Sequence, residues 1–125
     1  GAKLAELPSV QLRIAEAEAE LAAAYALMAR NRDEIIREAE AGNIPSEADR
    51  ARYRRDNAYA GRLSVQAVDR VYPIMGGRGI ASDSPVNRAW RDVHAVAHHI
   101  ALSWDNQAAP AGAFAVGVHA PDPNS

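Results

Sequence analysis

The chain has 125 residues, of which 48% are hydrophobic and 24% charged, and its formal net charge is −2. This length suits one domain with a single core. The absence of cysteine excludes disulfides and thiol catalysis, and the charge offers no basic excess for nucleic acid. No apolar run approaches the roughly 20 residues of a membrane span, and the sequence does not open with a signal-peptide pattern. We therefore expect a soluble, cytoplasmic protein.

A long amphipathic segment after Pro8 predicts the first helix. Its apolar residues recur every three or four positions, as Val10, Ile14, Ala17, Leu21, Ala24, Met28 and Ile35. Ser9 is the expected N-cap, and the run 41–43, Ala-Gly-Asn, is the expected stop. Three glutamates, Glu16, Glu18 and Glu20, are expected on the solvated side of this helix and not as a catalytic carboxylate pair.

A turn after Asn43 leads into the second predicted helix, which runs from Ser46 to about Val71 or Met75. Its serine start resembles a capping box. Pro73 has no backbone N–H to donate, so a kink or a stop is expected near that end. An arginine cluster, Arg50, Arg52, Arg54 and Arg55, opens this helix. We expect these arginines to pair with the acidic first helix, while the alternative is that they bind a phosphate or a neighbouring subunit.

A glycine loop separates the second helix from the third. Gly76, Gly77 and Gly79 have no Cβ, so a flat ligand or another chain can approach the backbone closely there. Arg78, set among them, would point a fixed positive charge into that gap. Asp83 or Ser84 can cap the next helix, with Pro85 at or near its first position, so the third helix is predicted to begin there.

The third predicted helix has two faces. Apolar residues form one stripe, Val86, Trp90, Val93, Ala97, Ile100 and Trp104. The other face is mostly polar and carries Arg88, Asp92, Ala95 and His99, with Arg91 and His98 beside it. At about 1.5 Å per residue, His99 lies roughly 16 Å beyond Arg88, so one elongated flat ligand could span them.

A fourth and weaker helix is predicted from Gln107 to about Val116, interrupted by Pro110 and Gly112. The tail that follows, 117–125, is expected to be irregular. Helices joined by short loops predict an all-α protein, an antiparallel four-helix bundle that spans residues 1–125 as a single domain.

Histidine chemistry needs a separate assessment. His94 and His98 are four residues apart, a spacing that can place two imidazoles on one metal. A zinc protease pattern would need glutamate at Ala95, and no third ligand is evident, so we predict no metal. His99 could accept or donate a proton near neutral pH. Trp90 and Trp104 are expected to pack within the bundle, with stacking on a flat cofactor as the alternative.

Two motifs carry a resemblance to a known family. They are the loop Gly-Gly-Arg at 76–78 and the helix run Asn-Arg-Ala-Trp-Arg-Asp-Val-His-Ala at 87–95, which is followed by a histidine eleven positions after Arg88. Together they resemble the C-terminal helical domain of two-component flavin-dependent monooxygenases, which are built on the acyl-CoA dehydrogenase fold. That family includes the 4-hydroxyphenylacetate hydroxylase oxygenase component, the steroid-degradation hydroxylase and dibenzothiophene monooxygenase. By position, His99 matches the family's active-site histidine and Arg78 the arginine of its glycine loop. The helix signature of the family is matched by Arg88, Trp90, Arg91 and Asp92.

The resemblance implies a function and a larger protein. The chain would be the C-terminal part of a flavoenzyme whose N-terminal helical and central β-domains lie outside it, and it would be inactive alone. The enzyme would use reduced flavin, FMN or FAD, from a separate reductase, with O₂, to hydroxylate a small aromatic or heteroatom substrate. Gly76, Gly77, Arg78 and Gly79 would contact the flavin, and Arg78, Arg88 and Arg91 the substrate. His99 would hold or deprotonate the substrate, or hydrogen-bond the flavin peroxide, and the parent would assemble as a homodimer or homotetramer.

Two alternatives stay open. One is a true acyl-CoA dehydrogenase, a family in which many members carry a Tyr-Glu-Gly-Thr-like loop that holds the base glutamate. The matching stretch here, residues 100–106, contains no glutamate, which disfavours that alternative. The other is a non-catalytic helical oligomerisation module.

Overall fold

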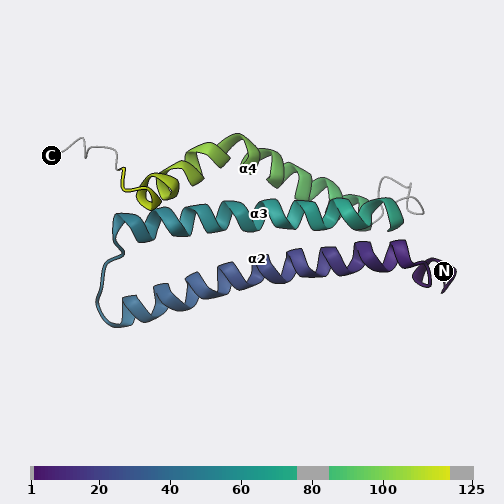
Figure 1. Cartoon of the computed structure of the whole chain (residues 1–125), viewed down its shortest axis with the longest axis horizontal. Coiled ribbons are helices and arrows are strands. Elements are labelled where there is room, and N and C mark those ends of the chain that lie inside the picture. Colours follow the sequence, from purple (N-terminus) through teal and green to yellow (C-terminus); the bar gives the residue numbers. More distant parts are fainter. Residues whose placement is uncertain (1, 76–84, 119–125) are drawn as a thin grey trace.

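A computed structural model of the chain describes residues 2–75 and 85–118 (Figure 1). It contains four helices in this part of the chain: α1 (Ala2–Ala5), α2 (Pro8–Glu40), α3 (Glu47–Met75) and α4 (Pro85–Ala115). No strand is present in these two ranges. The all-α class predicted from the sequence is therefore confirmed.

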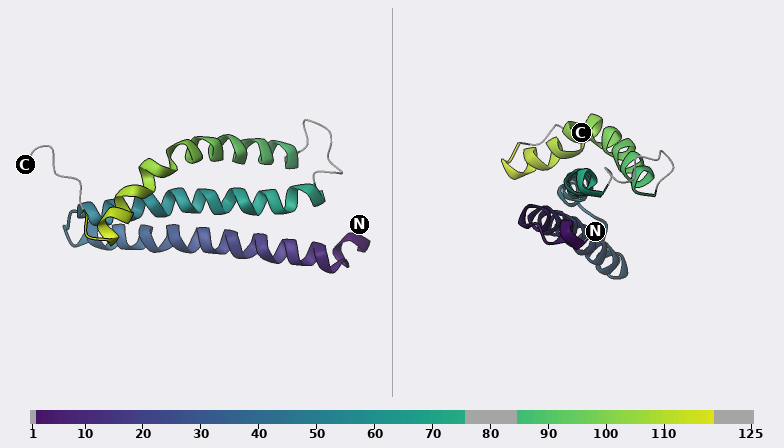
Figure 2. Two further views of the ribbon diagram at one scale, coloured as in Figure 1. Left: turned by 45° about the horizontal axis from the view of Figure 1, so that its top comes forward. Right: turned by 90° about the vertical axis from the view of Figure 1, so that its right-hand side faces the viewer.

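The three long helices run antiparallel, with α3 in the middle. Helices α2 and α4 each pack on α3, and within the described residues they do not pack on one another. Figure 2 shows this arrangement end-on, with α3 between its two neighbours. In the described part of the chain, α3 is therefore the central helix, with α2 and α4 packed on it as separate neighbours.

The segment 107–116, predicted as a separate fourth helix, is the last part of α4. The helix continues through Pro110, which lies in its interior. A proline removes one backbone hydrogen bond, but the surrounding helical bonds and the packing of this end of α4 on α3 maintain the helix. Similarly, α3 runs past Pro73 and ends at Met75, within the predicted range.

Most helix ends follow the predicted capping residues. Gly42, just after α2, has φ +78°, and the amides of Gly42 and Asn43 donate to the carbonyls of Ala39 and Glu38 at 3.1 and 2.9 Å. These two bonds make a Schellman motif, so the predicted stop is confirmed.

The predicted N-cap is confirmed for α3 but not for α2. At α3, the amide of Asp49 donates to Ser46 Oγ at 3.1 Å, which confirms Ser46 as the cap. At α2, the prediction of a Ser9 cap was wrong, because Leu7 occupies the cap position and makes no side-chain cap bond. Pro8 is already the first helical residue, where its missing N–H costs nothing.

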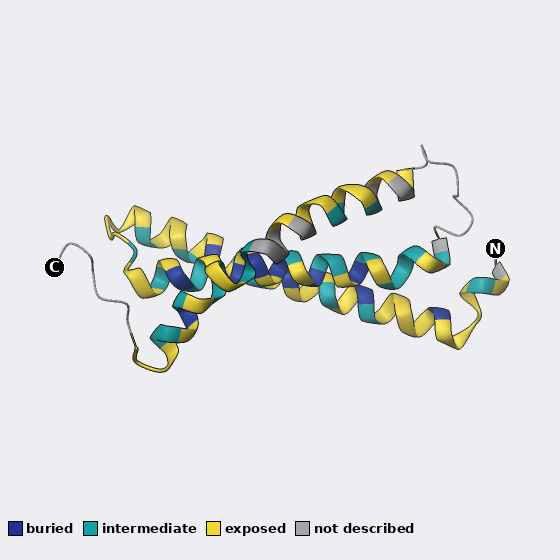
Figure 3. Cartoon of the chain, turned by 90° about the horizontal axis from the view of Figure 1, so that it is seen from above, coloured by how far each residue is buried: buried dark blue, intermediate teal, exposed yellow. Residues whose placement is uncertain are grey.

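The core consists largely of small residues. The buried apolar side chains are Val10, Ala17 and Ala24 of α2, Ala51, Ala58, Ala60, Leu63 and Ala67 of α3, and Ala111 of α4. Figure 3 shows that the buried positions lie mainly where α3 meets its neighbours. Small residues at a helix contact let the helix axes approach closely, which explains how so few large side chains suffice.

The apolar face predicted for α2 divides into two parallel stripes. Its small members, with Val10, are buried against α3, whereas its large members Ile14, Leu21, Met28 and Ile35 are 42–53% exposed. Leu7, the cap residue just before the helix, continues this row and is 47% exposed. We call these five residues, spaced seven apart, the α2 stripe. A single neighbouring helix covers only one stripe, so the α2 stripe has large apolar side chains in contact with solvent.

Polar groups also join α2 to α3. Glu16 and Glu20, expected on the solvated side, instead bind the guanidinium of Arg70 at 2.7 and 2.5 Å. Only 12% of the Glu20 side chain is exposed. The helical spacing placed these carboxylates correctly along α2, but their arginine partner is 50 or more residues away in the sequence.

A buried polar pair lies further along the same interface. Asp56 and Asn31 are 2% and 3% exposed, and Asn31 Nδ2 donates to Asp56 Oδ2 at 2.9 Å. Arg30 Nη2 and Arg55 Nε donate to the same carboxylate at 3.1 and 2.9 Å. Burial acts to raise the pKa of Asp56, but the hydrogen bonds from Asn31, Arg55 and Arg30 outweigh it and hold this pKa below its usual value.

Candidate functional site

The predicted site residues divide between described and undescribed parts of the chain. Gly76, Gly77, Arg78 and Gly79 lie outside the described residues. Arg88, Arg91 and His99 lie on α4, and all three are exposed. The structure therefore shows the helical half of the predicted site.

Helix α4 presents two faces, as predicted. Trp90, Val93 and Trp104 are partly buried, while the other members of the apolar stripe have undescribed side chains. Arg88, Asp92, Ala95 and His99 are exposed along the opposite face, with Arg91 beside them. We call Arg88, Arg91, Asp92 and His99 the exposed polar face of α4.

This face can bind an anionic or phenolic ligand. Neither Arg88 nor Arg91 forms an ion pair with another described residue, so both guanidinium groups are available as donors. The imidazole of His99 on the same face can donate or accept a hydrogen bond. The arrangement brings two cations, a carboxylate and a base to one side of α4.

A cluster of four side chains joins α3 to α4 at the end where the glycine loop connects them. Trp90 stacks on Tyr72 with ring centroids 4.8 Å apart and an interplanar angle of 27°. The ring of His94 lies 4.3 Å from that of Trp90. His94 Nε2 and Asp69 Oδ1 are 2.5 Å apart. We call Asp69, Tyr72, Trp90 and His94 the loop-end cluster.

Sequence reasoning missed the partnership of Asp69 with His94. A signal was present, because Asp69 lies one turn before Tyr72 on α3 and His94 one turn after Trp90 on α4. Two helices that run antiparallel and pack through the two rings would bring the carboxylate and the imidazole together. The register of the two helices was needed to see this.

The second tryptophan packs in the same way further along the helices. Trp104 lies 6.2 Å from the ring of Tyr59, and the guanidinium of Arg62 sits 4.4 Å from the Trp104 ring centroid. Each tryptophan of α4 therefore meets a tyrosine of α3. The prediction that both pack within the bundle is confirmed.

The arginine cluster at the start of α3 binds protein groups. Arg52 pairs with Glu34 of α2, Arg54 Nε donates to Gln107 Oε1 at 3.0 Å, and Arg50 Nη1 donates to the carbonyl of Pro45 at 3.0 Å. Arg55 pairs with Asp56. The expected pairing with the first helix is confirmed for Arg52, where the hydrogen bond from Arg52 holds the pKa of Glu34 below its usual value.

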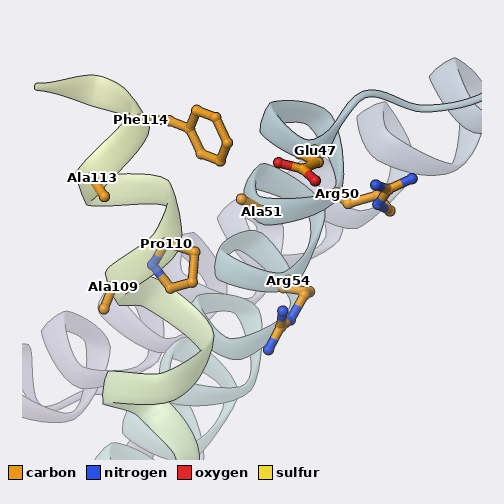
Figure 4. Close-up of a pocket in the computed structure, with 8 residues that line it drawn as sticks. All are labelled: Glu47, Arg50, Ala51, Arg54, Ala109, Pro110, Ala113 and Phe114. Carbon is orange, nitrogen blue, oxygen red and sulfur yellow. The ribbon is translucent and has the colours of Figure 1, made fainter. Parts of the chain in front are cut away.

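A cleft of about 560 Å³ lies between the start of α3 and the end of α4, at the opposite end of the helices from the loop-end cluster (Figures 1 and 4). Its lining is mostly apolar: Ala51, Ala109, Pro110, Ala113 and Phe114, with Glu47, Arg50 and Arg54 around them. Two of these polar groups are the arginines already bound by Pro45 and Gln107. We assign no chemistry to this cleft.

Two further findings concern ligands and membranes. Across residues 2–75 and 85–118, no group of three or more histidine or acidic side chains is placed to hold a metal ion. None of the helices in the described part of the chain is long and apolar enough to cross a bilayer.

Comparison with known proteins defines the class of this domain. The profile of the acyl-CoA dehydrogenase C-terminal domain matches residues 1–104, most of the chain. The chain belongs to this family of helical domains. No solved structure was found to match it significantly.

Several relatives are oxygenases. The chain is 37% identical over 107 residues to the FADH2-dependent resorcinol hydroxylase, oxygenase component, of Rhizobium sp. (strain MTP-10005). The aligned region covers 82% of the chain and 26% of the hydroxylase. It is 36% identical over 102 residues to the flavin-dependent monooxygenase, oxygenase subunit HsaA, of Mycobacterium tuberculosis, covering 81% and 26%. The p-hydroxyphenylacetate 3-hydroxylase, oxygenase component, of Acinetobacter baumannii is 28% identical over 98% of the chain and 29% of that protein. The chain thus spans about a quarter of the length of these relatives, and it is homologous to oxygenase components of flavin-dependent monooxygenases.

Proposed function

We propose that residues 1–125 form the C-terminal domain of the oxygenase component of a two-component monooxygenase. The remaining parts of that oxygenase, an N-terminal helical domain and a central β-domain, lie outside this chain. A separate reductase supplies the reduced flavin, FMN or FAD, and the enzyme hydroxylates an aromatic or heteroatom substrate with O₂. The observation that carries the proposal is the exposed polar face of α4, which combines two free arginines and a histidine in a chain homologous to such oxygenases.

The residues of this face fit the chemistry of the ligands. A flavin phosphate and a phenolate are both anionic, and the guanidinium groups of Arg88 and Arg91 can donate paired hydrogen bonds to either. Arg78 is the third cation of the proposed site, and Gly76, Gly77 and Gly79 allow a flat ring to approach the backbone. The bound reduced flavin supplies the reaction with oxygen, while the protein binds, orients and shields the reactants.

His99 is the proposed proton-transfer group. A phenol is more electron-rich at its ring once its hydroxyl proton is removed, so a base that accepts this proton assists oxygen transfer to the ring. His99 would accept it at one imidazole nitrogen and return it to solvent or product. Such general acid–base assistance typically contributes about 100- to 10,000-fold in rate.

The test replaces His99 by Ala in the full-length oxygenase and measures how much reducing equivalent reaches product and how much is released as hydrogen peroxide. We expect product formation to fall by about 100-fold or more and peroxide to rise, with the bundle still folded because His99 is exposed. His98→Ala is the matched control and should be much milder. Unchanged coupling in His99→Ala would remove His99 from the mechanism and leave the glycine loop with its arginine as the candidate site.

If the full-length protein were instead an acyl-CoA dehydrogenase, the same purified protein would give a different result. An acyl-CoA dehydrogenase would reduce an artificial electron acceptor when given an acyl-CoA. The proposed oxygenase would show no such activity and would consume O₂ only when reduced flavin is supplied. A non-catalytic module would do neither.

A further inference from the structure

The loop-end cluster joins the first half of α4, residues 85–99, to α3. At this end the two helices are joined by His94 Nε2 and Asp69 Oδ1, 2.5 Å apart, beside the stacked rings of Trp90 and Tyr72. At the far end they are joined by Arg54 and Gln107. Between these two ends, Trp104 of α4 contacts Tyr59 and Arg62 of α3.

The chemistry of the Asp69 contact defines the state of the imidazole. An ionised carboxylate can only accept hydrogen bonds, so Nε2 of His94 must carry a proton whether the ring is neutral or charged. The same ring also contacts Trp90, with ring centroids 4.3 Å apart and an angle of 39° between the ring planes. One side chain of α4 is thereby held both by a directional bond and by a ring contact.

The rotation of α4 decides where the exposed polar face points. Side-chain atoms lie about 6 Å from a helix axis, so a rotation of about 10° displaces them by roughly 1 Å. A misplacement of about 1 Å at a reacting centre can cost on the order of 100-fold in rate. His99 lies five residues beyond His94 on the same helix and projects from its exposed side.

We propose that His94 is a positioning residue: bound by Asp69 and in contact with the ring of Trp90, it sets the rotation of the first half of α4 and thereby the direction in which His99 projects. The inference rests on the proposed function, in which His99 contacts the substrate. It assigns a role to a histidine that the resemblance to the family left without one.

The first experiment tests the contact in the 125-residue chain itself. In ¹⁵N-edited NMR, the ring nitrogen shifts of His94 should show the proton on Nε2 in the wild type, and this preference should be lost in Asp69→Leu, which removes the acceptor. Asp69→Asn keeps an acceptor oxygen and should retain it. Backbone amides of residues 88–96 should exchange at least about tenfold faster in Asp69→Leu only. Unchanged exchange and an unchanged His94 signal would show that Asp69 does not hold this helix.

The second experiment tests positioning in the full-length oxygenase, with a matched control. Gln107→Leu removes the hydrogen bond that joins α3 to α4 at the far end. It therefore removes an interhelical contact comparable to the one with Asp69, but at a place away from His99. We expect Asp69→Leu to lower the yield of product per reduced flavin by about 10- to 100-fold with little change in substrate KM. Asp69→Asn should recover most of this loss, and Gln107→Leu should resemble the wild type. Equal losses in Asp69→Leu and Gln107→Leu would mean that His94 contributes stability alone.

A double variant separates this inference from the proposed function. If His94 acts through His99, Asp69→Leu should have no further effect on product yield in a His99→Ala background. An equal loss in both backgrounds would overturn the positioning role while leaving His99 as the base. Wild-type coupling in His99→Ala alone would instead overturn the proposed function, and the NMR result on His94 would stand independently.

Discussion

At the scale of single residues, the described part of the chain places its polar groups in two environments. The exposed polar face of α4 leaves its arginines free, whereas the α2–α3 interface satisfies its charges internally. Asp56 is the clearest case of the second kind, since it accepts hydrogen bonds from Asn31, Arg30 and Arg55 while being 2% exposed. Its role is therefore structural.

Replacing Asp56 by Ala should lower the free energy of unfolding by about 2 to 3 kcal/mol at pH 7, because a buried amide and two arginines lose their acceptor. The lowered pKa of Asp56 means that its contribution is fully present above the ordinary carboxyl range and is lost as the pH falls through its folded-state value. Urea unfolding at pH 7 and at acid pH should thus show the difference between variant and wild type shrinking in acid.

Asp33→Ala is the control for this measurement. Its carboxylate is 65% exposed and pairs with a neighbouring, exposed Arg32. A surface pair of this kind is worth about 0 to 1 kcal/mol. A loss in Asp33→Ala as large as that in Asp56→Ala would contradict the structural role given to Asp56.

Residue-scale prediction succeeded where neighbours are close in sequence and failed where they are distant. The cap of α3 by Ser46 and the stop at Gly42 depend on residues within one turn, so local chemistry predicts them. The pairings of Arg70 with Glu20 and of His94 with Asp69 depend on the register of two helices. That register is fixed by packing over the whole interface, which no local pattern contains.

At the scale of elements, the helices follow their hydrophobic periodicity more closely than their helix-breaking residues. Pro110 lies inside α4, where an interruption was expected, whereas α3 ends at Met75, two residues past Pro73 and within the predicted range. Each proline removes a single backbone bond from a helix of about thirty residues that is packed on a neighbour. Packing of an amphipathic face contributes more to helix stability than local propensity does, so the break at Pro110 was overestimated.

Two glycines of the same chain should respond oppositely to alanine. Gly42 has φ +78°, a backbone conformation in which a Cβ costs about 1 to 2 kcal/mol, so Gly42→Ala should destabilise the chain. Gly112 lies within α4, and no atom lies within 4 Å of the position its Cβ would take. Gly112→Ala should therefore stabilise it by about 0.5 to 1 kcal/mol. Thermal unfolding of both variants beside the wild type checks the signs, and a shift of both in one direction would contradict the capping geometry.

At the scale of the whole molecule, the sequence predicted the antiparallel helices but not that α3 lies between α2 and α4 in the described part of the chain (Figure 2). Periodicity shows that a helix has an apolar face but does not show which helix covers it. The predicted apolar face of α2 thus divides between α3 and solvent. The α2 stripe, with its five exposed large side chains, is the surface on which we expect self-association.

We predict that the chain is heavier than a monomer in solution at tens of micromolar and that Leu21→Lys shifts it toward the monomer. Leu21 is the middle residue of the α2 stripe, and a charge there would have to be buried in any helix pair formed through it. Sedimentation or light scattering measures the mass directly.

Leu12→Lys is the matched control for self-association. Leu12 is 62% exposed and lies nine residues from Leu21, on the opposite side of α2. A lysine there should leave the mass unchanged. A monomeric wild type, or equal effects of the two lysines, would count against the α2 stripe as the contact.

The central position of α3 also bears on how the chain folds. Because α2 and α4 contact α3 and not each other, the described interhelical contacts join helices that are consecutive in the sequence. The two interfaces are then those of two overlapping helical hairpins, and such local topologies generally fold fast. They also couple weakly, since the α2–α3 hairpin can form before α4 docks. Coupling between the α2–α3 hairpin and the α3–α4 hairpin therefore passes through α3, the helix they share, as it does between neighbouring units of a repeat protein.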